Sequence, residues 1–419
     1  MTRLKNKTKA NHSRLEKLQY FKELISHKLP VECYVRQLRA LAIIHGIMEY
    51  EIATCDDELL SAIWEDDLRK LPLLLEDILH FKHEKVLDCK VCIEAAQAMA
   101  EKMRFRKVDN PVTLFGYLYT FEGSTLGNKM HRKDISATFH LDKYNGSNYY
   151  ASYRDKVEGN WKQFSEKVNN ILSDTSLHDQ IIEASYEAYY GLEVLYNALF
   201  PIDCQEKIIH VTSINPEAGN HAIPENELEI QAALKASEGI WNEFPYYQQR
   251  YGERGRRFSD SDMCWLVTLI QLDIGTVKKQ IKWIGGLLSG KGMPQILLEQ
   301  TLLFLHKELI KANPDNKTDY DKLFSSAQML KELRIKAISE KAFEELSNNF
   351  EQGIGRQLAE KYKNFGILLV SAVADEKNEI GGALLSIYKW MTDKERFSES
   401  WISAVDDLIK NARLAVKKD

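Results

Sequence analysis

Long apolar runs are missing from this chain of 419 residues. No run of about 18 or more apolar residues occurs, which is the length that a membrane-spanning helix needs. Residues 1–9 are polar and basic with no apolar segment behind them, so a secretory signal is not expected either. The sequence therefore predicts a cytoplasmic protein with no membrane as partner.

Cysteine is also scarce, with six residues in the whole chain. Six cysteines in a chain of this length do not indicate a disulfide framework. Cys89 and Cys92 form one C-x-x-C motif, but no second pair follows at the spacing of a zinc site. We expect two reduced thiols here, with a redox or metal role as the less favoured alternative.

An excess of positive charge is likewise absent, since the formal net charge is −5. Phosphate binding needs a basic surface, so nucleic acid is not expected as a main partner. The composition is 44% hydrophobic and 28% charged, which is ordinary for a globular protein. The length exceeds what one hydrophobic core usually serves, so we expect two domains of about 200 residues each.

Only nine prolines interrupt the chain, and polar and apolar residues show no convincing alternation between turn signals. Apolar residues instead recur every three or four positions, which is typical of amphipathic helices. The sequence predicts helices over 4–27, 32–53, 57–81, 86–105, 110–132, 159–172 and 176–199, then over 226–240, 260–288, 294–312, 317–350, 355–373 and, with breaks, 379–417.

The stretch 200–225 differs from its surroundings, because it holds three prolines and has little periodicity. We therefore predict an all-α protein with a first domain at 1–205, a linker at 206–225 and a second helical domain at 226–419. The sequence indicates no function for the second domain.

His12 and Glu16 stand at i and i+4 of the opening helix, so they share one face. A neutral imidazole can give one nitrogen to iron while its other N–H donates to a carboxylate, which fixes the tautomer. Taken alone, such a pair is more often an ordinary surface contact.

Gly123 and Gly127 also share one helix face, at a cost of about 1 kcal/mol each relative to Ala. Their bare backbone suits the close approach of a planar ligand or of another helix.

The two motifs, TKANHSRLE at 8–16 and EGSTLG at 122–127, together resemble the heme oxygenase family, particularly its bacterial members, over roughly residues 1–200. The resemblance implies a heme-oxygenase-like helical bundle. In the family the N-terminal histidine is the proximal iron ligand, which implies that role for His12 and makes Glu16 its hydrogen-bond partner. It also implies that Gly123 and Gly127 are the backbone contacts on the distal side of the heme.

Further site residues follow from the same resemblance. Lys5 and Lys162 stand at positions where the family places basic residues near the heme propionates. Ser124 stands where mammalian members have an acid that organises distal water, and Ser124 or a water would donate the hydrogen bond needed there. The sequence departs from the family at Leu118, where some members have a tyrosine, and at Glu166, where a second basic residue is usual.

The activity that the resemblance implies is oxidative cleavage of heme, which serves as both cofactor and substrate. The products would be biliverdin, CO and Fe²⁺, with O2 and electrons supplied through a ferredoxin, flavodoxin or reductase partner. Two alternatives stay open. A heme-binding sensor without turnover is one, because the chain is about twice as long as a stand-alone heme oxygenase. A non-heme diiron oxidase of the same fold is the other, with His45, Glu49, Glu183 and Glu187 as ligands.

Overall fold

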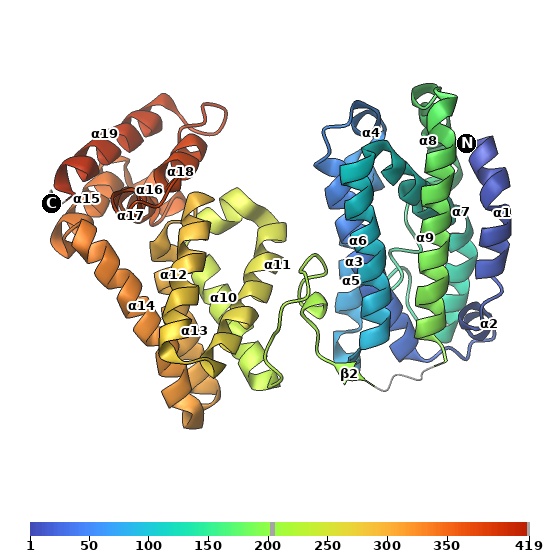
Figure 1. Ribbon diagram of the computed structural model, residues 1–419, viewed down its shortest axis with the longest axis horizontal. Helices are drawn as coiled ribbons and strands as arrows, with labels where there is room; N and C mark the ends of the chain where they lie inside the picture. Colours follow the sequence, from blue (N-terminus) through green and yellow to red (C-terminus); the bar gives the residue numbers. More distant parts are fainter. Residues whose placement is uncertain (202–205, 417–419) are drawn as a thin grey trace. The chain divides into compact units, whose positions relative to one another are not determined.

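The chain divides into two compact units, Met1–Gly219 and Asn220–Asp419. The computed structural model describes residues 1–201 and 206–416 (Figure 1). Both units consist of helices, joined by short turns and by one small pair of strands. The prediction of an all-α protein is therefore confirmed. The described helices include none that is both long and apolar enough to cross a membrane.

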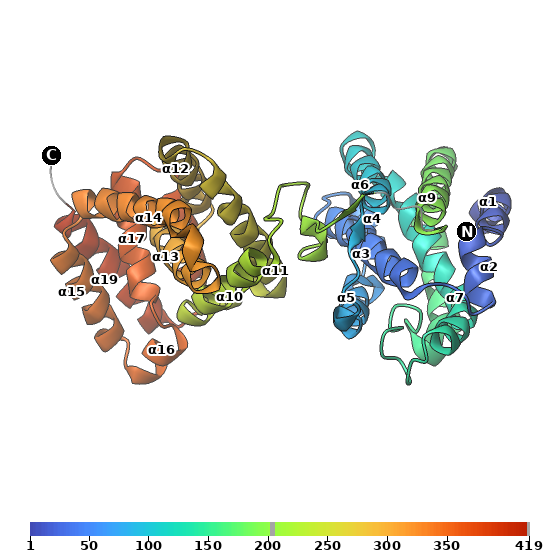
Figure 2. The same cartoon turned by 90° about the horizontal axis from the view of Figure 1, so that it is seen from below.

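The first unit is a layered bundle whose central helix, α3, is buried on nearly every side (Figures 1 and 2). Its two short strands pair antiparallel. The elements in chain order are α1 (Thr2–Leu15), α2 (Gln19–Ile25), α3 (Val31–Ala53), α4 (Glu58–Ile63), α5 (Leu71–His80), β1 (Asp88–Cys89), α6 (Lys90–Asp109), α7 (Leu114–Thr138), α8 (Val157–Ile171), α9 (His178–Leu199) and β2 (Lys207–Ile208).

Two long helices expected in this unit are each divided. The range 4–27 forms α1 and α2, because Leu18 adopts an extended conformation between them. The range 57–81 forms α4 and α5 with a 3-10 turn between them, at Asp66–Leu68. Asp57 starts α4 by accepting a 2.8 Å hydrogen bond from the Leu60 amide. Apolar periodicity continues through such short breaks, so it could not locate them.

The cysteine prediction is half right. Cys92 is a free thiol whose Sγ lies 3.4 Å from the carbonyl oxygen of Ala198, and burial raises its pKa to about 11. Such a thiol is unreactive as a nucleophile or metal ligand. Cys89, in contrast, is disulfide-bonded, so the expectation of a reduced thiol is wrong there.

Helix α9 contacts both α1 and α7 and so holds them on the same side of the unit (Figures 1 and 2). The closest approach is at Gly116 of α7. A β-carbon added there would lie 2.4 Å from the Ile181 carbonyl oxygen and 2.7 Å from the Ser185 amide nitrogen of α9. Gly116 is thus required for helix packing. Gly116 therefore serves as the reference for a packing glycine, with which the surroundings of Gly123 and Gly127 can be compared.

The second unit is a separate helical body with its own core, in which α17 is buried almost throughout. Side-chain caps start several of its helices, among them Asn226, Asp273, Ser339 and Ser398. Its elements are α10 (Glu227–Glu243), α11 (Tyr246–Thr268), α12 (Ile274–Gly290), α13 (Gln295–Ala312), α14 (Lys317–Ala337), α15 (Glu340–Gly353), α16 (Arg356–Lys361), α17 (Phe365–Lys377), α18 (Ala383–Met391) and α19 (Glu399–Ala415).

Candidate functional site

A cavity in the first unit brings together residues that the sequence analysis selected from two distant motifs, one on α1 and one on α7. Aromatic and aliphatic side chains form much of its wall, as in most small-molecule sites. The lining residues are His12, Leu15, Glu16, Phe21, Leu41, Thr120, Phe121, Ser124, Gly127, Asn128, His131, Tyr149, Tyr150, Tyr189, Leu192 and Tyr196.

His12 and Glu16 lie on the α1 wall of this cavity. The Nδ1 atom of His12 faces Oε2 of Glu16 at 3.5 Å, and both side chains are about half exposed, at 50% and 57%. The ring of His12 also meets that of Tyr189 edge to face, with centroids 6.4 Å apart. Because Nδ1 faces the carboxylate, Nε2 is the nitrogen left for a ligand.

Helix α7 forms the other wall, and its two predicted glycines have different surroundings. Gly127 lines the cavity, and a β-carbon added there would have no neighbour within 4 Å. Gly123 does not line the cavity. A β-carbon at Gly123 would meet the Trp161 ring at 3.3 Å. Gly127 therefore opens a space that helix packing does not fill, whereas Gly123 accommodates an indole from α8.

Ser124 lines the cavity beside Gly127, with its hydroxyl donating to the Phe121 carbonyl oxygen at 2.6 Å. Tyr149 also lines the cavity and contacts a buried histidine of α3. The Tyr149 hydroxyl is 3.3 Å from Nε2 of His45, and Nδ1 of His45 is 3.5 Å from Oε1 of Glu49. Burial raises the pKa of Tyr149, so its hydroxyl keeps its proton and can donate into the cavity.

Asn128 and His131 also line the cavity, and the sequence analysis did not select them. The Nδ2 atom of Asn128 and the Nδ1 atom of His131 are both buried without a hydrogen-bond partner. Burial lowers the pKa of His131, with a smaller opposite effect from the charges of Asp134 and Glu16. Their spacing from Ser124 and Gly127 repeats every three or four residues, so the helical pattern could have revealed them.

The two lysines assigned to the propionates lie outside the cavity lining. Lys5 is exposed on α1. Lys162 is exposed on α8, with its ammonium nitrogen 3.9 Å from Oε1 of Glu166. At the position without the family's tyrosine, Leu118 is buried. The structure therefore places both lysines at the surface of the same unit without joining them to the cavity wall.

The four residues of the diiron alternative do not come together. His45 and Glu49 are buried on α3, where Oε1 of Glu49 accepts hydrogen bonds from two backbone amides at 2.7 and 2.9 Å. Glu187 of α9 instead pairs with Arg106 at 2.7 Å, and its neighbour Glu183 is largely exposed. No group of three or more potential metal ligands occurs within residues 1–201 and 206–416.

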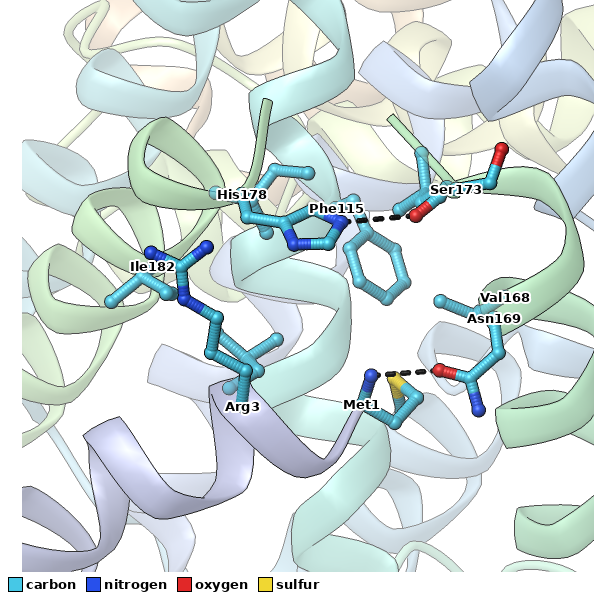
Figure 3. A pocket seen from close by; sticks show the side chains of 11 residues that line it. Met1, Arg3, Phe115, Val168, Asn169, Ser173, His178 and Ile182 are labelled. Carbon is cyan, nitrogen blue, oxygen red and sulfur yellow. Dashed lines mark hydrogen bonds between the residues drawn. The ribbon is translucent and has the colours of Figure 1, made fainter. Parts of the chain in front are cut away.

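A second cavity, of about 360 Å³, lies at the other end of α1 (Figure 3). Phe115 and Val168 are among its apolar lining residues, and Asn169 accepts a 2.8 Å hydrogen bond from the Met1 amine. His178 projects toward it, with Nε2 3.0 Å from a backbone carbonyl oxygen. None of the residues predicted for the site lines this cavity.

The residues of the first cavity fit a heme. Its α1 wall offers an imidazole nitrogen, its α7 wall leaves bare backbone at Gly127, and two buried side-chain nitrogens lack partners among the described residues. Residues 1–196 match the family model described as heme oxygenase. These residues of the first unit are therefore similar to the heme oxygenase family. The match ends within this unit, so it covers just under half of the chain.

The curated relatives that match this chain include two heme oxygenases. Heme oxygenase 2 of Mus musculus is 23% identical over 197 residues, and heme oxygenase 2 of Rattus norvegicus is 24% identical over 198 residues. Each match covers 46% of this chain and 62% of the relative, so the chain spans less than two thirds of either.

Two similar structures are heme oxygenase-1 from the cyanobacterium Synechocystis in complex with heme and heme oxygenase from Leptospira interrogans. The first is 20% identical with a TM-score of 0.43 and covers 48% of this chain and 91% of that one. The second is 19% identical with a TM-score of 0.43 and covers 47% and 98%.

Proposed function

We propose that the first unit is a heme oxygenase domain, which binds heme between His12 and α7 and cleaves it oxidatively to biliverdin, CO and Fe²⁺. The observation that carries the proposal is the cavity itself. Its α1 wall has an imidazole that faces a carboxylate, and its α7 wall has a glycine with open space before it. Because the cleavage consumes electrons, the proposal includes an external donor such as a ferredoxin, a flavodoxin or a reductase.

The residues of this chain have separate tasks in the proposed reaction. His12 would hold the iron through Nε2, and Glu16 would keep the ring in one tautomer by facing Nδ1. Gly127 leaves room for the plane of the ring to approach the α7 backbone. Tyr149 keeps a protonated hydroxyl at the wall, and Ser124 lies beside Gly127. When bound, heme supplies the oxidising chemistry itself, so no acid–base pair is required of the protein.

The experiment is a turnover assay on the full chain loaded with hemin. Ascorbate, or a ferredoxin with its reductase, is added in the presence of O2 while the absorption spectrum is followed. We expect the Soret band to decay and a broad band of biliverdin to grow at long wavelength, with CO trapped by a globin. His12→Ala should abolish the histidine-ligated spectrum. His83→Ala is the matched control, because His83 is exposed and does not line the cavity.

Each alternative function predicts a different result. A heme spectrum that stays unchanged under reductant and O2 would contradict cleavage and support the heme-binding sensor. A chain that binds no heme would contradict both proposals, and two irons per chain in metal analysis would then support the diiron oxidase. One observation favours the sensor as second candidate, namely the additional histidine in the cavity.

A further inference from the structure

The α7 wall of the cavity carries two buried polar atoms that have no hydrogen-bond partner in the described part of the chain. Asn128 is 6% exposed, and its Nδ2 is buried without a hydrogen-bond partner. One turn later on α7, the Nδ1 atom of His131 is also buried without a hydrogen-bond partner among the described residues. Buried polar groups are nearly always hydrogen-bonded, so two exceptions on one wall of a cavity require an explanation. A ligand that enters the cavity would provide partners for both.

The direction of helical side chains places His131 beside the open space at Gly127. A side chain on an α-helix tilts toward the N-terminus of the helix and covers the preceding turn. For His131 that turn contains Gly127, which has no side chain, and the position of its missing β-carbon is free for 4 Å. The imidazole therefore has access to the part of the cavity where the α7 backbone is bare.

His12 lies on the wall formed by α1, so the cavity has a histidine on each of two helices. α1 and α7 are held by contacts with the same helix, α9, and the charges of His12 and Glu16 act on His131 across the cavity. The Phe21 ring packs on the His131 ring with a centroid distance of 5.2 Å. Both imidazoles thus border one space that suits a planar ligand.

We propose that His131 is a second axial ligand, so that heme in the resting protein is held by two histidines, His12 and His131. Imidazole is a common ligand of iron, whereas the amide of Asn128 is not, which assigns the ligand role to His131 and leaves Asn128 as a hydrogen-bond donor beside it. The inference rests on the heme site proposed above. It adds that O2 or CO must displace His131 before it can bind.

The consequence concerns both candidate functions. A heme with two protein ligands has no free position for a gas, so its reactivity depends on how often His131 leaves the iron. In the oxygenase, this would make the opening of the distal side a controlled step. In the sensor, the same ligand would protect bound heme from cleavage.

The test uses the full chain with one equivalent of hemin and reads the spin state of the ferric iron by electron paramagnetic resonance. We expect a low-spin signal of two imidazole ligands in the unmodified protein. His131→Ala should lose that signal and become high-spin with heme still bound, and added imidazole should restore the low-spin form. Restoration shows that the variant is folded. The control His83→Ala should remain low-spin, because His83 is exposed and does not line the cavity.

A second measurement needs no substitution. After reduction, the rate of CO binding should reach a plateau as CO is increased, because departure of His131 limits it. In His131→Ala the rate should rise linearly. A high-spin signal in the unmodified protein, or a low-spin signal that persists in His131→Ala, would overturn the second ligand while leaving heme binding intact. Failure of the unmodified chain to bind hemin would instead overturn the proposed function together with this inference.

Discussion

Alanine at two glycines of α7 should change stability in opposite directions. At Gly116 a β-carbon would lie 2.4 and 2.7 Å from backbone atoms of α9, so the two helices must separate. Overpacking of this kind costs about 1–3 kcal/mol, and the gain in helix propensity returns about 1 kcal/mol. Gly116→Ala should therefore destabilise the unit by up to about 2 kcal/mol. At Gly127 only the propensity gain applies, since nothing lies within 4 Å.

The same comparison tests the heme site. Gly127→Ala should stabilise the heme-free protein by up to about 1 kcal/mol and yet weaken hemin binding, because its methyl group enters the cavity. Gly127→Leu should weaken hemin binding further. Gain of stability with loss of affinity is not expected from a glycine that serves only helix packing.

Hydrogen exchange of peptides from α7 and α9 measures the opening of this unit without contribution from the second one. Hemin titration supplies the affinities. The reasoning is refuted if Gly127→Leu binds hemin and turns over normally, because the heme would then not approach this backbone. It is refuted at Gly116 if alanine there stabilises the unit as it does at Gly127.

Three further predictions concern neighbouring groups. Glu16→Ala should retain heme, and its heme affinity should fall less than about tenfold because the pair with His12 is half exposed. The iron–imidazole stretching frequency measured by resonance Raman should also fall. An unchanged frequency would contradict a hydrogen bond between Glu16 and His12. Lys70→Met should cost about 3–5 kcal/mol in unfolding free energy, since it leaves the buried Glu122 carboxylate, 3.1 Å away, unpaired. The double variant Lys70→Met/Glu122→Leu should recover most of that loss. A loss as large as that of Lys70→Met alone would contradict the reasoning. Burial raises the pKa of Asp77 to about 6, above the unfolded value of 3.8, so the folded state binds this proton more tightly. Its contribution to stability should therefore decline by about 3 kcal/mol as pH rises from about 4 to about 6, and level off above. The unfolding free energy measured by hydrogen exchange should depend less on pH in Asp77→Asn than in the unmodified protein. An equal dependence would rule out Asp77 as its source.

Helix periodicity located most of the fold. The ranges expected for α3, α9 and α13 differ from the observed helices by two residues or fewer at either end. One error is the first part of α11, which begins at Tyr246 and not at 260. Several others lie where a helix stops briefly without a proline or glycine, as at Leu18. A single extended residue ends the hydrogen-bond ladder there but leaves the apolar spacing almost unchanged, so the pattern continues across it.

The site was predictable to the extent that its residues share one helix. The spacing of His12 and Glu16 placed them on one face, and the structure has them 3.5 Å apart. Spacing alone could not distinguish Gly123 from Gly127. What separates them is Trp161 of α8, which packs against Gly123 and leaves Gly127 open. Which neighbour faces a glycine depends on tertiary packing, and helical periodicity contains no information about it.

Tyr149 shows why the remaining wall could not be predicted. It belongs to the irregular segment after α7, where neither helix nor strand periodicity applies. It nevertheless lines the cavity and contacts His45. Its position is set by Asp77 of α5, whose two carboxylate oxygens accept hydrogen bonds of 2.7 and 2.8 Å from the backbone amides of Asn148 and Tyr149. Those bonds join positions 71 and 72 residues apart. Such a contact is favourable only once both segments are folded. The position of Tyr149 in the cavity wall therefore depends on the Asp77 carboxylate, and sequence spacing does not connect these two residues.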